Sequence, residues 1–212
     1  MVEHLVPSLS LQKVLARDQA DVQALRNRFE AAEALESTDR QIKARRVELQ
    51  ERMSADLSER EVAVTQATIL FSDYARALYG DDRTAYLVIS ADESGVKFSP
   101  HIESDESQGI SSMVIFCFDL SMAVIAHRNG RGPDFLVHDS HLFDGVDSRQ
   151  IARALQLGSS VTAAEGIQYI VTMNSDDLQK AAGHGFNAEQ YLLPVRLTDD
   201  REDGGLFGFR FP

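Results

Sequence analysis

The feature that most constrains the fold is residues 9–79, a stretch that contains neither proline nor glycine. Because these two residues interrupt helices most readily, the stretch is free to form one long helix. At 1.5 Å per residue, such a helix would reach on the order of 100 Å, which is far beyond the width of a small domain. We therefore predict a coiled-coil arm over residues 9–79, after an N-terminal segment at residues 1–8 and before a globular part at residues 80–212.

Apolar residues in the predicted arm follow two heptad registers, as in a coiled-coil seam. The first register contains Leu15, Val22 and Phe29, and the second contains Leu35, Ile42 and Leu49. The two registers do not join, which indicates a stutter near residues 32–36. Because polar residues interrupt this thin seam, the stability of the arm must depend on a partner helix.

The globular part alternates apolar runs with turn-forming residues in the manner of an α/β fold. We predict strands at residues 84–90, 96–102, 135–137, 166–174, 191–197 and 206–211. We predict helices at residues 113–126, 146–157 and 175–183. One polar residue, Asp119, interrupts the apolar stretch 113–126. A buried carboxylate needs partners, so we expect Asp119 to form hydrogen bonds within the globular part or to face its junction with the arm.

Three short segments are candidates for a nucleotide site. The apolar run 135–137 leads to Asp139, and a strand that ends in one carboxylate is how nucleotide-hydrolysing α/β folds hold Mg²⁺. Upstream, the small turn at residues 107–109 opens a helix, whose free N–H groups and positive dipole end bind phosphate oxygens. Downstream, the predicted strand 166–174 ends with the polar residues Thr172 and Asn174.

This order of segments resembles the C-terminal half of an ABC-type ATPase head of the SMC, RecN and Rad-type DNA-repair class. The resemblance implies a signature-like motif, formed by Ser107, Gln108 and Gly109, that contacts ATP held by the opposite head. It also implies that Asp139 is the Walker B acid and binds Mg²⁺. Residues 142–147, which end in Asp147, resemble the D-loop, and Asn174 occupies the position of the switch histidine.

Residues 115–120 and 135–140 resemble more closely a bacterial family of unknown function, DUF2326. Its members form the C-terminal part of SMC-like coiled-coil ATPases. The resemblance covers residues 9–180. It implies an α/β fold in which the C-terminal lobe of an ABC-type ATPase head, a sheet with flanking helices, follows a long coiled-coil helix.

The sequence departs from the ABC pattern at several points. Ser140 stands where a catalytic glutamate normally orients the attacking water, Asn174 replaces the switch histidine, and the signature-like motif has one glycine. Ser140 or His141 could replace the missing glutamate, or both could be spectators. No segment matches the phosphate-binding Walker A pattern G-x-x-x-x-G-K-[ST]. We therefore expect ATP and Mg²⁺ to bind only in a complete head, and the isolated chain to be inactive.

Two functions remain open. The first is the C-terminal part of an SMC-like ATPase, which completes a head with a separate Walker A-bearing half and couples ATP-dependent head closure to coiled-coil arms in DNA repair or defence. The second is a non-catalytic coiled-coil module for dimerisation or interaction that retains an ABC-like fold. We expect a homodimer through the arm or the heads in either case. The presence of a Walker A-bearing half would favour the first function.

Charge and cysteine content restrict the partners and the compartment. The net charge of −12 argues against an autonomous grip on nucleic acid, so DNA contact would need a local patch or the missing half. Cys117 is the only cysteine, which fits a reducing cytoplasm. We expect no membrane span, because the stretch 113–126 contains Asp119 and is shorter than the roughly 18–20 residues needed.

Clustered acids and histidines near Asp139 allow a different interpretation, a transition-metal site. The candidate ligands are His138, Asp139, His141, Asp144 and Asp147. Successive residues of a strand point to opposite faces, so His138 and Asp139 are not expected to share one metal. The sequence also lacks the partner cysteines of a structural zinc site. A Mg²⁺ role for Asp139 alone is therefore the favoured prediction.

Overall fold

The computed structural model describes residues 5–92, 94–194, 196–198, 200–205 and 207–209. The chain divides into two units. The first contains residues 1–59 and 90–97, and the second contains residues 60–89 and 98–212. Helices and two small sheets make up the regular structure, which is compatible with the predicted α/β class.

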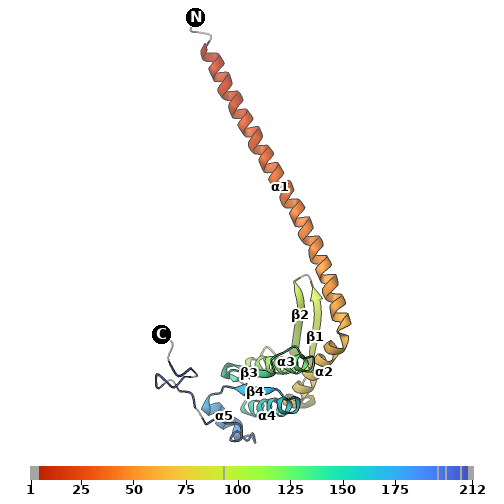
Figure 1. Ribbon diagram of the computed structural model, residues 1–212, viewed down its shortest axis with the longest axis vertical. Helices are drawn as coiled ribbons and strands as arrows, with labels where there is room; N and C mark the ends of the chain where they lie inside the picture. The colour runs from red at the N-terminus through yellow and green to blue at the C-terminus, as the bar shows by residue number, and fades with distance from the viewer. Residues whose placement is uncertain (1–4, 93, 195, 199, 206, 210–212) are drawn as a thin grey trace. The chain divides into compact units, whose positions relative to one another are not determined.

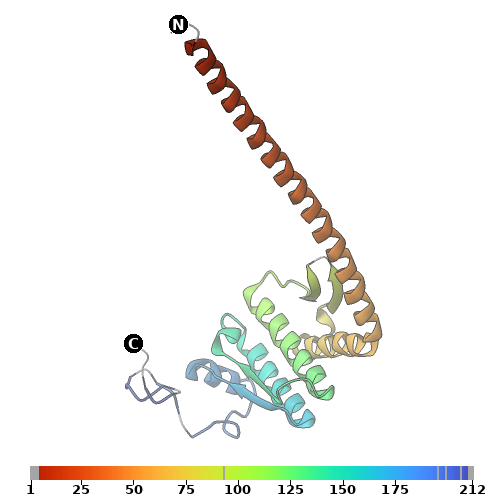
Figure 2. The ribbon, with the colours of Figure 1, turned by 45° about the horizontal axis from the view of Figure 1, so that its top comes forward.

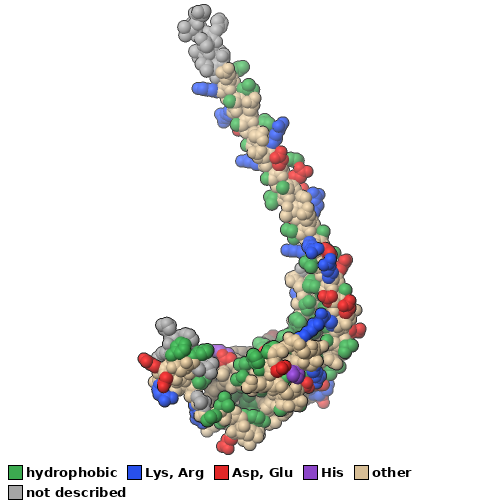
Figure 3. Space-filling model, in the orientation of Figure 1, with side chains coloured by type: hydrophobic (Ala, Val, Ile, Leu, Met, Phe, Trp, Pro, Cys, Tyr) green, Lys and Arg blue, Asp and Glu red, His purple; other side chains and the backbone are tan. Residues whose placement is uncertain are grey.

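The first unit is dominated by one long helix, α1 (Leu5–Glu59) (Figure 1). Its apolar side chains are exposed between charged ones, as the space-filling view in Figure 3 shows. Phe29 is 71% exposed, and Val22 and Ile42 are about half exposed. Isolated helices bury no apolar face, so α1 must draw stability from a partner helix or from ion pairs such as Lys43–Asp39, at 2.8 Å. The pairing of α1 in a coiled coil stays a prediction.

The helix predicted over residues 9–79 is present in two parts, and the expectation of one continuous helix is wrong at Arg60. There the backbone has φ −102° and ψ 19°, outside the α-helical region, and α2 (Glu61–Tyr79) begins at the next residue. No proline or glycine marks this position. The break separates the exposed residues of α1 from α2, whose Phe71 and Leu78 are buried in the second unit. Packing of α2 in that core accounts for it.

The core of the second unit lies between α2, α3 (Gln108–Arg128) and α4 (Ser148–Glu165). Both other helices contact α2, and Figure 2 shows them side by side. The strands β1 (Ala85–Asp92) and β2 (Gly95–Ile102) pair with one another, and a short 3₁₀ turn, η1 (Gly80–Asp82), precedes them. The largest fully buried side chains of the core are Phe71, Phe116, Leu78, Ile102, Met113 and Leu120.

The second sheet consists of the parallel strands β3 (Phe135–His138) and β4 (Gln168–Val171), joined through α4. The 3₁₀ turn η2 (Ser140–Phe143) follows β3, and α5 (Ser175–Ala182) follows β4. In the register, Leu136 lies beside Tyr169 and His138 beside Val171. These four side chains face the helices, where α3 contacts β3 and α4 contacts β4.

The opposite face of the β3–β4 sheet is partly exposed among the residues that the structure describes. Phe135 and Val137 are about half exposed, and Ile170 is 39% exposed. Parallel sheets normally have both faces covered, because crossover helices pack on each side. Each strand also has one unpaired edge, since β3 and β4 pair only with each other among the described residues. The sheet is therefore incomplete within the described part of the chain.

Two sequence expectations fail in this unit. The strands predicted at residues 191–197 and 206–211 are absent among the residues described there, while 195, 206, 210 and 211 lie outside the described residues. The stretch 113–126 is also part of a longer helix than expected. By length and composition alone α3 could cross a membrane, although seven of its residues are buried in the protein, including Phe116 and Leu120.

Candidate functional site

Asp139 lies directly after β3, and Thr172 lies directly after β4. Because His138 and Val171 are partners in the parallel register, the next residues of the two strands lie side by side. The Thr172 N–H donates to the carbonyl oxygen of His138 at 3.0 Å, and Thr172 Oγ1 donates to Asp139 Oδ1 at 3.0 Å. The two strand ends thus carry a carboxylate and a hydroxyl in direct contact.

The Asp139 carboxylate is exposed, and its neighbours favour the ionised form. Ser140 Oγ also donates to Asp139 Oδ1 at 3.0 Å. The hydrogen bond from the Ser140 hydroxyl, followed by that from Thr172 and by the Ser140 backbone N–H, lowers the pKa of Asp139 below its usual value. Asp139 is therefore negatively charged near neutral pH. A carboxylate with neighbouring hydroxyl oxygens is a ligand set that suits Mg²⁺, which prefers oxygen donors and keeps several waters.

Ser140 and His141, the candidates to replace a catalytic glutamate, are both engaged locally. The Ser140 hydroxyl donates to Asp139, and His141 Nδ1 lies 2.9 Å from Asp144 Oδ2. The hydrogen bond with Asp144 raises the pKa of His141 above its ordinary value, and that contact occupies Nδ1 of the ring. Neither side chain is thus placed by these contacts as a general base.

Ser107, Gln108 and Gly109 form the first turn of α3, with Ser107 at the N-cap position. The Ser107 side chain makes no capping hydrogen bond, which leaves its hydroxyl outside the helix-capping role. A Cβ on Gly109 would lie 2.7 Å from the carbonyl oxygen of Gly145 and 3.3 Å from the Cα of Val146. This close approach permits only glycine at position 109. The signature-like turn is therefore packed directly against the D-loop-like segment.

Asp147 and Asn174 occupy the N-cap positions of α4 and α5. Asp147 Oδ1 accepts from the Arg149 N–H and from Arg149 Nε, each at 3.0 Å, and the Arg149 side-chain contact is the main cause of its lowered pKa. The Asn174 side chain makes no capping hydrogen bond, although its carbonyl oxygen accepts from the Leu178 N–H at 3.1 Å. The Asp147 side chain therefore caps α4, whereas the Asn174 side-chain amide does not cap α5.

The structure groups the predicted site residues into two contacts. The Asp139 carboxylate accepts hydrogen bonds from Ser140 and Thr172, and Gln108 and Gly109 lie against the D-loop-like segment. Among the described residues, no hydrogen bond joins Asp139 to Ser107, Gln108 or Gly109. Sequence reasoning noted Thr172 only as a polar strand end and did not assign it to the site. Its signal was the position one residue after a buried strand, equivalent to Asp139.

A transition-metal site finds no support. Within residues that the structure describes, no three His, Cys, Asp or Glu side chains are placed to hold a metal ion. His138 is 4% exposed and its Nδ1 lies 2.9 Å from the hydroxyl of Tyr169, whereas Asp139 is exposed. The expectation that these neighbours point to opposite faces is confirmed. His138 belongs to the interior of the unit, and sequence reasoning missed its partners Tyr169 and Asp119.

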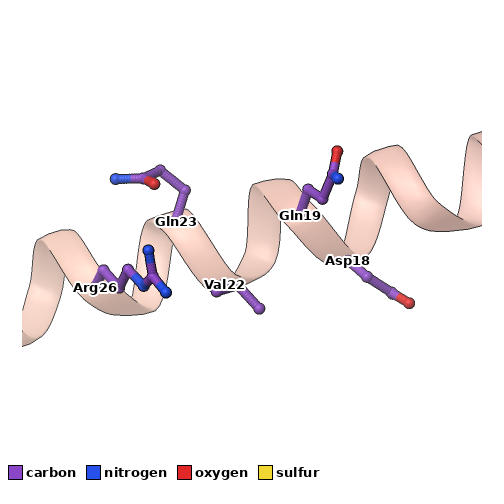
Figure 4. Close-up of a pocket in the computed structure, with 5 residues that line it drawn as sticks. All are labelled: Asp18, Gln19, Val22, Gln23 and Arg26. Carbon is purple, nitrogen blue, oxygen red and sulfur yellow. The ribbon is translucent and has the colours of Figure 1, made fainter.

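Two hollows of the surface lie away from these residues. One, of about 340 Å³, is a space between side chains of α1, which Figure 4 shows. It is lined by Asp18, Gln19, Val22, Gln23 and Arg26. A second, of about 270 Å³, lies around Arg76 and Gly80. Neither of these two hollows contains a predicted site residue.

Comparison with known proteins places all of these candidate residues within one family. Residues 74–211 match the family described as "Uncharacterised protein conserved in bacteria (DUF2326)". The match includes α3, α4, both strands of the parallel sheet and every candidate residue from Ser107 to Asn174. The comparison with curated proteins finds no match. Since the family model covers more than half of the sequence, the chain belongs to the DUF2326 family.

Proposed function

We propose that this chain is the C-terminal part of an SMC-like ATPase, which forms a nucleotide-binding head together with a separate Walker A-bearing half. The observation that carries the proposal is the β3–β4 pair. It presents the ionised Asp139 beside Thr172 at its carboxyl end, and it leaves one apolar face and two edges uncovered. Ligands of open α/β sheets bind at the carboxyl ends of strands.

The incomplete sheet supports the need for a second half. Phe135, Val137 and Ile170 expose a small apolar surface on a parallel sheet, an arrangement that is normally covered. The chain also has no Walker A sequence, so it lacks the glycine-rich loop that cradles phosphates. A partner that supplies both a covering layer and that loop would complete the sheet and the site together.

The site residues divide the work in this proposal. Asp139 would hold Mg²⁺, with Thr172 and Ser140 fixing the carboxylate through their hydroxyls. Bound Mg²⁺ would neutralise the phosphate charge of ATP. Ser107, Gln108 and Gly109 would present the N-terminus of α3 to ATP on an opposing head, and α1 would be the arm that head closure moves. The same assembly could act in DNA repair or defence.

A non-catalytic interaction module is the second candidate, and one observation favours it. Ser140 stands at the usual position of the catalytic glutamate, and its hydroxyl is committed as a donor to Asp139. No strong base is then available beside the acid. In that case the head would close on ATP without hydrolysing it, and the exposed apolar residues of α1 would serve dimerisation.

The test compares ATP hydrolysis by the chain alone, by a Walker A-bearing half alone and by the two mixed. We expect turnover only in the mixture, and calorimetry should show no tight ATP binding by the chain alone. Micromolar binding of ATP–Mg²⁺ by the chain alone would contradict the half-head assignment. Nucleotide binding without turnover in the mixture would select the non-catalytic module.

A matched pair of variants tests where the second half docks. Val137 and Val88 are both strand valines that are about half exposed. We expect Val137→Lys to prevent association with the Walker A-bearing half, because it places a charge on the uncovered sheet face. Val88→Lys on β1 should leave association unchanged. Equal association by both variants would remove the sheet face from the proposal.

A further inference from the structure

Three polar side chains gather at the buried His138, next to the candidate site, and the proposed function gives them no role; one of them, Asp119, has a side chain that is 38% exposed. They are Asp119 on α3, His138 at the end of β3 and Tyr169 on β4. His138 Nδ1 lies 2.9 Å from the Tyr169 hydroxyl, and His138 Nε2 lies 3.4 Å from Asp119 Oδ2. These three side chains therefore link α3, the helix of the signature-like turn, to both strands of the parallel sheet.

Tyr169, at one end of this set of side chains, is closely packed. A Cβ on Gly158 of α4 would lie 2.5 Å from Cε1 of Tyr169, so the glycine makes room for the ring. Burial, followed by the charge of Asp119, raises the pKa of Tyr169, and its hydroxyl keeps its proton. Tyr169 can then donate to His138 Nδ1. The remaining proton of a neutral His138 lies on Nε2, on the side of Asp119.

The contact at the other end, between His138 and Asp119, lacks a hydrogen bond. His138 is 4% exposed, yet its Nε2 makes no hydrogen bond to any described residue. Asp119 Oδ2 is within ion-pair distance of Nε2 but outside hydrogen-bond geometry. A buried donor without an acceptor is unfavourable, so there is a driving force to close this contact. A small movement of α3 relative to β3 would suffice.

His138 is also connected directly to the site. Asp139 follows it in the chain, and its carbonyl oxygen accepts the Thr172 N–H at 3.0 Å. A displacement of the His138 backbone would therefore act on Asp139 and Thr172 together. Phe116 of α3 packs against the His138 ring, with 5.5 Å between ring centroids, which ties the same helix to the same residue.

We propose that His138 is a positioning residue that couples α3 to the strand ends, with the Asp119–His138 contact as the adjustable link. The first turn of α3 carries Ser107, Gln108 and Gly109, so movement of that turn would be felt at Asp139. The importance of Asp139 as a Mg²⁺ ligand rests on the proposed function, whereas the coupling itself stands on the geometry of the isolated chain.

The test uses NMR of the full chain without nucleotide, so it is independent of ATPase activity. Asp119→Asn keeps the side-chain shape and removes the charge. We expect it to shift the amide resonances of Ser140 and Thr172, and we expect this shift to be lost in a His138→Leu background. Loss of the histidine should also speed hydrogen exchange at the Thr172 amide on the order of tenfold.

Conservative variants separate coupling from packing. His138→Gln keeps an amide near the position of Nε2 and should restore the response of Thr172 to Asp119→Asn, whereas His138→Asn, which reaches only as far as Nδ1, should not. Ser121→Ala is the control, because it removes a polar group at a different position of α3, a buried hydroxyl bonded to the Cys117 carbonyl at 2.7 Å. It should leave Ser140 and Thr172 unchanged.

The proposal is overturned if Asp119→Asn leaves Ser140 and Thr172 unchanged, or if it shifts them equally with and without His138. Should His138→Leu fail to fold, Tyr169→Phe replaces it, because that variant keeps the ring and removes only the hydroxyl bonded to His138. The response of Thr172 to Asp119→Asn should then shrink, and an undiminished response would count against the coupling. Either of these results would leave the ATPase proposal unaffected, because ATP hydrolysis by the mixed halves tests that proposal separately.

Discussion

The hydroxyl of Thr172 donates a hydrogen bond to the carboxylate of Asp139, with 3.0 Å between Oγ1 and Oδ1, from the end of one parallel strand to the end of the next. Thr172→Val removes this bond with little change in shape. We expect the pKa of Asp139 to rise toward 3.8, because one of the bonds that stabilise the ionised form is lost. The measurement is a carboxyl ¹³C titration of Asp139.

The direction of the accompanying change in stability follows from the linkage between proton binding and folding. A carboxyl whose folded pKa is depressed stabilises the fold above its unfolded pKa, and this contribution is lost as the pH falls through the folded value. The variant should therefore lose less stability in acid than the wild type. Thr38→Val, which removes an exposed hydroxyl of α1, is the control. An Asp139 titration that is identical in Thr172→Val and wild type would show that the bond is not formed in solution.

Gly109→Ala tests the contact between the signature-like turn and the D-loop-like segment. Its methyl group would lie 2.7 Å from the Gly145 carbonyl oxygen, and overpacking of this kind destabilises by about 1–3 kcal/mol. The gain in helix propensity from glycine to alanine is at most about 1 kcal/mol, so we expect net destabilisation in urea unfolding.

Gly205→Ala is the matched control for Gly109→Ala, because among the described residues its new methyl group would meet only the Phe209 carbonyl oxygen, at an ordinary 3.7 Å. We expect its urea midpoint to lie close to that of the wild type. A Gly109→Ala chain as stable as the control would mean that the turn and the D-loop-like segment are not in contact.

The sequence predicted the helices and the internal strands because each is set by a local pattern. Asp139 follows its strand as expected, since an apolar run with a polar end is visible in one dimension. The contact of Thr172 with Asp139 was not visible, because it depends on the register of strands 33 residues apart. The break at Arg60 was missed for a related reason: the core that α2 packs against lies elsewhere in the sequence.

The two predicted terminal strands are absent among the residues described there. A strand needs a neighbouring strand to satisfy its backbone groups, whereas the N–H groups of Tyr191 and Leu192 donate to the Ala188 carbonyl oxygen in a turn. The buried His138 could have been flagged, since it is a lone polar residue in an apolar strand. Its partners on α3 and β4 could not have been, because they lie 19 and 31 residues away.

Alkaline pH should destabilise the second unit through two tyrosines of α2. Burial is the main cause that raises the pKa of Tyr74 and of Tyr79 from 10.0 to about 12. Because both folded values lie above the unfolded value, their stabilising contribution is complete below pH 10 and is lost as the pH rises through about 12.

Urea midpoints measured from pH 8 upward should therefore fall less steeply in Tyr74→Phe and Tyr79→Phe than in the wild type. Tyr86→Phe, at a side chain that is 45% exposed, is the control and should follow the wild type. Parallel pH dependence in all four proteins would show that neither phenol of α2 resists ionisation in the folded chain.

Asp139→Asn should abolish ATP hydrolysis by the head reconstituted with a Walker A-bearing half, whereas Ser140→Ala should have a smaller effect. Asparagine keeps the oxygen that accepts from Ser140 and Thr172, so the fold should survive, but it lacks the charge that a Mg²⁺ ligand provides. A loss of several kcal/mol of charge stabilisation corresponds to a rate reduction of at least about 100-fold. Ser140 is a donor to Asp139, and a serine without an activating neighbour is not a strong base near neutral pH.

Asp134→Asn is the matched control for Asp139→Asn, because Asp134 precedes β3 at its opposite end and is bonded to His127 at 2.8 Å. Turnover should be close to that of the wild type in this variant, and thermal melting should show that every protein is folded. Wild-type turnover in a well-folded Asp139→Asn head would remove Asp139 from the Walker B role. Since the β3–β4 strand ends would then carry no essential charge, the case for an ATPase would lose its central observation.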